Sequence, residues 1–321
     1  MTTAAPDGRA ALLAGLGCYV LWGLSPLIYQ PMGAAGADAF EIMGHRAVWG
    51  LLWATVLVLW ARQSDQVKAA FADRRTLGWL MLSTALIALN WALFVWAVNN
   101  GHTLETSLGY YLNPLLNMAL GAWLFRERIS GAGLVAIALA AAGVALQAVA
   151  LGRLPIVSLT LAVSFAAYGV IRKRVRADAQ AGLFVECLIM APFGLAWLIW
   201  LQTQGAGVFF DRPNAAFWLA MAGPVTVGPL VLFSWAARRL PLTTIGFLQF
   251  VAPTISFVIG VSQGEDFTWL RGVSFGFIWL GAGVFLCDHA EMLHWLTGFT
   301  ISETFYRACV LPLEGDPVWI L

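Results

Sequence analysis

The densest group of residues that could do chemistry in this apolar chain is Glu41, His45 and Arg46, near the start of a long apolar run. On a helix, Glu41 and His45 share one face, while Arg46 is rotated by about 100° from His45. A carboxylate beside an imidazole and a guanidinium could bind a zwitterion or relay a proton, because histidine titrates near neutral pH. A structural ion pair at the rim of a membrane is the alternative. A gate or proton-coupling role for these three residues is therefore a hypothesis.

Polar residues and prolines interrupt two later apolar runs in matching positions. Proline removes one backbone hydrogen bond from a helix, and paired interrupted helices are a pointer to the site or hinge of a transporter. The alternative is a structural kink. We predict a cavity or hinge at these interruptions, formed by Tyr110, Asn113 and Pro114 in one run and by Gln249 and Pro253 in the other.

Six further side chains have two interpretations each. An amide buried in lipid needs partners, so Asn90, with its neighbour Trp91, either joins helices or lines the cavity. Two aromatic residues could stack on a planar substrate or pack in the core. Two carboxylates near the ends of apolar runs are either gates or solvated helix ends. The two aromatic residues are Trp22 and Tyr168, and the two carboxylates are Glu105 and Glu186.

Several kinds of chemistry lack a sequence signal. The four cysteines are scattered without metal or redox spacing, so we predict no metal site. No nucleotide-binding or hydrolase motif is present, so we expect no cofactor. We also expect no enzyme activity, because the only candidate for an intramembrane catalytic pair is Glu41 with His45, and no catalytic motif accompanies it. A net charge of +1 gives no support for a nucleic-acid partner.

The elements that position these residues follow from the composition. Of 321 residues, 60% are hydrophobic and 11% are charged, against about 25% charged in soluble domains, so most of the surface must face lipid. Backbone groups in lipid must be satisfied within each segment, so each apolar run is a helix. We predict an all-α integral membrane protein with ten transmembrane helices, at 9–30, 39–62, 76–98, 103–125, 131–151, 155–172, 182–202, 214–236, 242–263 and 269–288.

Basic residues in the connections set the orientation. With the N-terminus in the cytoplasm, the inside segments hold 13 lysines and arginines, among them Lys68 and Arg172, and the outside connections hold 3. The predicted location is therefore a bacterial inner membrane, with both termini cytoplasmic. The last part of the chain, 289–321, is expected to be a weakly ordered cytoplasmic tail.

An internal repeat divides the chain into two halves. Pro114 is followed seven residues on by Gly121, and Pro253 is followed seven residues on by Gly260. Each half holds five spans, and duplication of an odd number turns the second copy over. We therefore predict an inverted pair of five-helix repeats, 1–152 and 153–288, as in many secondary transporters.

Four stretches carry a family resemblance. They resemble the RarD subgroup, named for chloramphenicol sensitivity, of the drug/metabolite transporter superfamily with paired EamA domains, and the similarity runs from about Gly15 to Asp288. The stretches are Glu41-Ile-Met-Gly-His45-Arg46, Asn90-Trp91-x-x-Phe94-x-Trp96-Ala97-Val98-Asn99-Asn100, Leu104-Glu105-x-Ser107-Leu108-Gly109-Tyr110 and Gly246-Phe247-x-Gln249-x-x-x-Pro253.

The resemblance implies secondary active transport by alternating access. The implied substrates are small metabolites, amino acids or amphipathic drugs, moved by efflux. A non-transporting membrane sensor or assembly partner is the alternative function, and an intramembrane enzyme a weaker one. The expected partners are a small-molecule substrate and the lipid bilayer. A homodimer is left open by the sequence.

Overall fold

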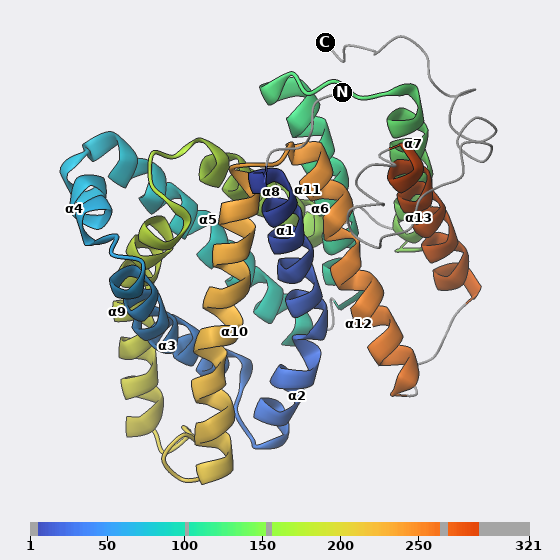
Figure 1. Cartoon of the computed structure of the whole chain (residues 1–321). Coiled ribbons are helices and arrows are strands. Elements are labelled where there is room, and N and C mark those ends of the chain that lie inside the picture. Colours follow the sequence, from blue (N-terminus) through green and yellow to red (C-terminus); the bar gives the residue numbers. More distant parts are fainter. Residues whose placement is uncertain (1–5, 100–102, 152–155, 264–268, 289–321) are drawn as a thin grey trace.

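A computed structural model describes residues 6–99, 103–151, 156–263 and 269–288, and every regular element in these ranges is an α-helix (Figure 1). The expected tail, 289–321, lies outside the described residues. The helices are α1 (Pro6–Leu24), α2 (Pro26–Ala34), α3 (Ala39–Trp60), α4 (Ser64–Ala72), α5 (Arg74–Asn99), α6 (Thr103–Phe125), α7 (Gly131–Leu151), α8 (Ile156–Arg174), α9 (Ala179–Thr203), α10 (Pro213–Ala237), α11 (Leu242–Gln249), α12 (Val251–Ser262) and α13 (Trp269–Asp288).

The described residues form thirteen helices rather than the ten predicted, and twelve of them correspond to the predicted apolar runs. The first run is divided into α1 and α2, where Pro26 begins α2, and the ninth is divided into α11 and α12 at Phe250. The short helix α4 was not predicted, because it is polar and lies in a connection.

Seven helical stretches in the described residues are long and apolar enough to cross a membrane. Two of these stretches each combine two helices, α1 with α2 and α11 with α12. The other five are α3, α5, α8, α9 and α10. Helices α7 and α13 contain shorter apolar stretches. The protein is therefore an all-helical, multi-pass membrane protein.

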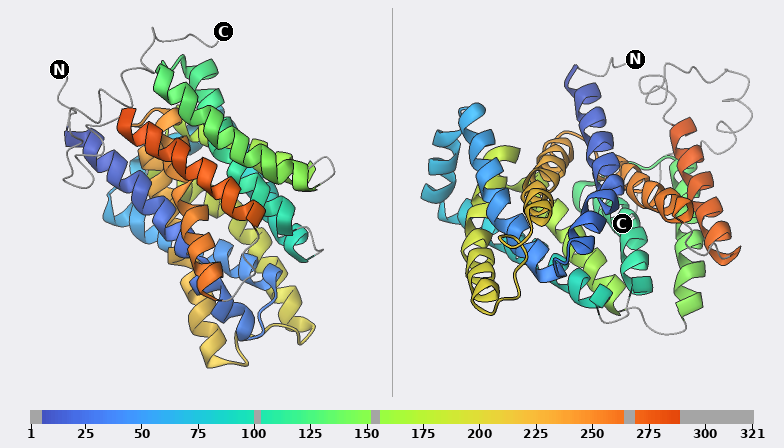
Figure 2. Two further views of the ribbon diagram at one scale, coloured as in Figure 1. Left: turned by 90° about the vertical axis from the view of Figure 1, so that its right-hand side faces the viewer. Right: turned by 90° about the horizontal axis from the view of Figure 1, so that it is seen from below.

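Helices from the first part of the sequence, up to α7, pack against helices from the later part. The packed pairs are α3 with α9, α6 with α11, α7 with α13, α1 with α10, and α5 with α8. Glycines allow close approach at these crossings, since a Cβ on Gly44 of α3 would come within 3.3 Å of the Gly194 carbonyl oxygen of α9. The pair α7 and α13 lies at one edge of the molecule and α4 at the opposite edge (Figure 1, Figure 2).

Several connections between helices meet at one end of the molecule. Gln66 of α4 donates a hydrogen bond of 2.7 Å to Asp178 before α9, and the Nη2 atom of Arg238 after α10 lies 3.4 Å from Asp178. Lys173 at the end of α8 lies 3.5 Å from Glu127 after α6. These contacts gather the connections that the sequence predicts to be rich in lysine and arginine.

Candidate functional site

A small cavity lies between helices of both halves. Its volume is about 10 Å³, about the space that one water molecule needs. It is bounded by α3, α5, α8, α9 and α10, through Arg46, Ala47, Ile87, Trp91, Tyr168, Leu183, Glu186, Cys187, Met190, Thr226 and Leu230. Two charged side chains, Arg46 and Glu186, therefore face the same enclosed space.

On one side of the cavity, Glu186 belongs to a buried charge network. Its Oε1 atom lies 3.5 Å from Nη1 of Arg172, and the two side chains are 3% and 0% exposed. The hydroxyl of Ser83 donates to the same oxygen at 2.5 Å, and the hydroxyl of Tyr168 donates to Oε2 at 3.3 Å. The carboxylate is thus paired with one guanidinium and accepts hydrogen bonds from two hydroxyl groups. The interpretation of Glu186 as a solvated helix end is wrong, because its side chain is buried.

The Arg172 side chain is held in place from three other directions. Its Nε donates to Ser234 of α10 at 3.0 Å, and its Nη2 donates to the Ala179 carbonyl at 3.1 Å. A Cβ on Gly182 would lie 2.2 Å from Nη1, so the guanidinium fits only because residue 182 lacks a side chain. This network joins α5, α8, α9 and α10.

On the other side of the cavity, Arg46 lies among aromatic and hydroxyl groups. Its guanidinium carbon lies 4.1 Å from the ring centre of Trp91 and 5.5 Å from that of Tyr29. Its Nε donates to the Thr226 hydroxyl at 2.9 Å, and its Nη1 lies 3.5 Å from the Met43 sulfur. Such cation–π contacts are favourable, but they do not neutralise the charge.

Glu41 and His45 do not reach this cavity. The Glu41 carboxylate accepts a hydrogen bond of 2.8 Å from the backbone of Val208, in the connection between α9 and α10. The His45 ring stacks on Phe209 at 4.6 Å and accepts a hydrogen bond from Trp49 at 3.2 Å. Glu41 and His45 therefore both contact the connection between α9 and α10, whereas Arg46 lines the cavity.

The polar residues predicted to line a cavity are spread over several helix contacts. Asn90 donates to the Leu161 carbonyl at 2.8 Å and to the Ser164 hydroxyl at 2.9 Å, so it joins α5 to α8. Asn113 is buried, and its Oδ1 atom has no hydrogen-bond partner in the described structure. Tyr110 is 42% exposed and packs against Phe94. Glu105 lies in α6, with its side chain outside the described part of the chain.

The two proline-containing runs cross each other closely. Asn117 of α6 donates a hydrogen bond of 2.8 Å to Gln249 of α11, and a Cβ on Gly246 would lie 2.7 Å from the Pro114 carbonyl oxygen. Pro253 lies in α12 and is half-buried. The structure thus brings Gln249 and the Pro114 turn together, and neither lines the small cavity.

The carboxylate of Glu127 caps the start of α11. Its two oxygens accept the backbone N–H groups of Leu242 at 2.6 Å and of Thr243 at 2.8 Å. The first N–H groups of a helix have no partner within the helix, and a negative charge there is favourable. A residue of the first half therefore anchors a helix of the second.

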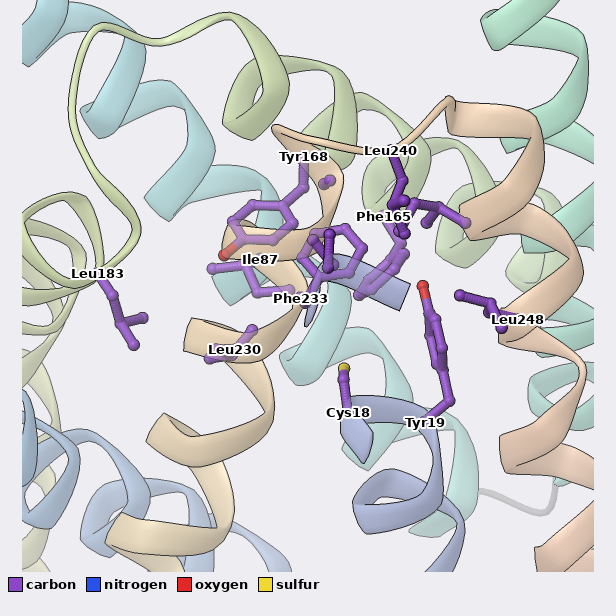
Figure 3. Packing of buried hydrophobic residues seen from close by; sticks show 14 of the residues in the cluster. Cys18, Tyr19, Ile87, Phe165, Tyr168, Leu183, Leu230, Phe233, Leu240 and Leu248 are labelled. Carbon is purple, nitrogen blue, oxygen red and sulfur yellow. The ribbon is translucent and has the colours of Figure 1, made fainter. Parts of the chain in front are cut away.

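The two aromatic residues at matching repeat positions meet in a shared cluster. The Trp22 ring centre lies 5.8 Å from Phe165 and 5.9 Å from Phe233, and Tyr168 stacks on Phe233 at 5.9 Å. Figure 3 shows Tyr168, Phe165 and Phe233 within this buried cluster. Trp22 therefore packs in the core, whereas Tyr168 both packs there and reaches Glu186.

Sequence reasoning missed three members of the site: Arg172, Ser83 and Thr226. Arg172 was counted only as one of several basic residues in a connection, although it follows Tyr168 by one helical turn and so shares its face. Ser83 and Thr226 are single hydroxyl residues in apolar runs, and no sequence pattern distinguishes them. In the described ranges, no three His, Cys, Asp or Glu residues are grouped to hold a metal ion.

Comparisons with known proteins agree on one group. Residues 9–149 match the EamA-like transporter family. An uncharacterised transporter of Pseudomonas aeruginosa is 42% identical over 283 residues, covering 87% of this chain and 94% of its own. Protein RarD of Escherichia coli is 37% identical over 286 residues, covering 88% and 96%. One solved structure has a TM-score of 0.65 over 85% of this chain and 95% of its own, at 18% identity, which shows the fold alone.

Proposed function

The chain belongs to the RarD subgroup of the EamA-like transporter family, and we propose that it is a secondary transporter that moves small molecules by alternating access. The transported molecules would be metabolites, amino acids or amphipathic drugs, and the direction efflux. The observation that carries this proposal is the cavity between α3, α5, α8, α9 and α10, which is lined by Arg46 and by Glu186, the carboxylate that pairs with Arg172.

The arrangement of helices supports ten spans in two inverted repeats, 1–152 and 153–288. Exchange of the halves would turn the contact of α1 with α10 into a contact of α8 with α5, and both pairs are in contact. The same exchange relates α3 to α9, α6 to α11 and α12, and α7 to α13, whose members also pack together. Inverted repeats of this kind place the substrate site at the interface between halves.

Two interrupted runs support a hinge, but they are not the pair expected from the prolines, because α6 continues unbroken through Pro114. The first run is divided after Leu24 and the ninth at Phe250, and these two runs are adjacent, since α1 packs on α12. Discontinuous helices near a site are a recurring feature of secondary transporters. The segments assigned to the inside hold 13 basic residues, of which Arg172 is buried within α8. From this excess we propose an inner-membrane location with both termini cytoplasmic.

Transport is tested in two stages. The purified chain is first screened by thermal shift against amino acids, small metabolites and amphipathic drugs at several pH values. Stabilising compounds are then radiolabelled and used in counterflow with proteoliposomes, where an internal excess of the same compound drives uptake of label. We expect counterflow that is absent from protein-free liposomes and is lost in the Asn113→Leu variant, which replaces a buried amide by an apolar side chain of similar size.

The alternative functions give different results. A membrane sensor or assembly partner would bind a ligand without counterflow. Binding without counterflow in well-reconstituted vesicles would therefore overturn transport. Reconstitution is checked by freeze-fracture or by protease protection, and folding of the Asn113→Leu variant by gel filtration.

A further inference from the structure

The charges around the cavity do not balance. Arg46 and Arg172 are two positive charges, and Glu186 is one negative charge that already contacts Arg172. In the described residues, no carboxylate lies within ion-pair distance of Arg46, whose contacts are Thr226, Met43 and two aromatic rings. Arg172 does not line the cavity, but its pairing with Glu186 leaves Arg46 without a counter-charge, so these three side chains together carry one positive charge in excess.

An unbalanced charge inside a membrane protein is costly. Arginines within membrane-spanning segments are therefore normally paired, and Arg46 is half-buried in α3. Glu186 cannot neutralise Arg46 as well, because Ser83, Tyr168 and Arg172 already occupy its two oxygens. The negative charge that would balance Arg46 is therefore not supplied by the described side chains.

We infer that Arg46 binds the negatively charged group of the transported molecule, and that this molecule is an amphipathic organic anion with a single carboxylate. This inference rests on the proposed function. A guanidinium has five N–H donors in a planar fork that matches a carboxylate, and only Nε has an oxygen partner among the described residues. The rings of Trp91 and Tyr29 beside the guanidinium offer an apolar surface for the body of the same molecule.

The test uses probes that differ only in charge. The full chain in lipid nanodiscs is titrated with sets of one carbon skeleton as carboxylate, amide and amine, such as 3-phenylpropionate, 3-phenylpropionamide and 3-phenylpropylamine. Further sets are built on benzoate, indole-3-acetate and decanoate. We expect at least one carboxylate to bind about tenfold or more tightly than its amide, as a charge-assisted hydrogen-bonded pair should, and the amine to bind most weakly.

Variants then assign the preference to one residue. In Arg46→Gln, the affinities for carboxylate and amide should differ by less than about twofold, whereas Arg46→Lys should keep a reduced preference because it keeps the charge. Arg176→Gln is the matched control: it removes the charge of an exposed arginine outside the site, so the preference should remain. A structural role alone would lower the affinity for all three probes together.

The results that overturn the inference differ from those that overturn transport. If no carboxylate in the panel binds more tightly than its amide, the unaltered protein already refutes the inference, whatever the folding of the variants. A preference that survives in a folded Arg46→Gln protein refutes it as well. Arg46-dependent anion binding without counterflow would overturn transport but leave the anion site intact. Counterflow of neutral or cationic compounds alone would support transport but overturn the anion site.

Discussion

Replacement of Glu186 by glutamine should be among the most destabilising single changes of a polar side chain in this protein. The variant keeps the shape of the side chain but leaves Arg172 buried without a counter-charge, and the two side chains are 3% and 0% exposed. Removal of one partner of a buried ion pair costs about 3–5 kcal/mol. Because Ser83 and Tyr168 can still donate to the amide oxygen, we expect a loss of about 3 kcal/mol, at the low end of that range.

The size of the loss distinguishes an ion pair from ordinary helix contacts. Hydrogen bonds between helices in lipid contribute about 0.6 kcal/mol on average and at most about 1.7 kcal/mol. A loss near 3 kcal/mol can therefore come only from the unpaired charge. The assay is equilibrium unfolding in mixed micelles by titration with sodium dodecyl sulfate, followed by circular dichroism.

A double-mutant cycle completes the experiment. The Arg172→Met change removes the other charge, so Glu186→Gln with Arg172→Met should lose less stability than the sum of the single variants, by about 1–3 kcal/mol. Arg176→Gln, at an exposed arginine of the same basic stretch, is the control and should change stability by less than about 0.5 kcal/mol. Our account of this network would be refuted by a Glu186→Gln loss below about 1 kcal/mol, or by additive losses.

Three further predictions follow from single contacts. Gly182→Ala should destabilise by about 1–3 kcal/mol, because its Cβ would lie 2.2 Å from the Arg172 guanidinium, while Gly78→Ala, whose Cβ meets nothing within 4 Å, should be neutral or stabilising; equal effects in the unfolding assay would contradict this. Glu127→Gln should cost about 1 kcal/mol as a lost helix cap, and unchanged stability would show that the cap contributes nothing. Single cysteines at Gln66 and Asp178, which are in contact, should both react with an impermeant maleimide from the cytoplasm and not from the periplasm, in a variant without native cysteines; labelling from opposite sides would refute the topology.

The membrane class and the helices could be predicted from the sequence because they depend on local properties. An apolar run of sufficient length must be a helix in lipid, whatever its neighbours are. The predicted run 269–288 has the same bounds as α13, Trp269–Asp288. The breaks at Ser25 and Phe250 were not predicted, although Pro26 was a visible signal for the first.

The sequence could indicate which residues were candidates for the site, but not which of them contact each other. Arg46, Trp91, Tyr168 and Glu186 were all candidates, and the structure brings these four to one cavity. Asn90 was also a candidate, yet its amide joins α5 to α8. An amide in an apolar run has to find partners in either case, so its sequence context cannot decide between the two roles.

Composition and the spacing of apolar runs alone determined that this chain is a multi-pass helical membrane protein, because the requirement to satisfy backbone groups in lipid acts on each segment separately. Only the tertiary structure decided which charges are buried. Arg172 and Arg176 belong to one basic stretch, but Arg172 alone faces Glu186 and the space left by Gly182. Such a pairing depends on how α8, α9 and α10 pack, and that packing brings together residues that are far apart in the sequence.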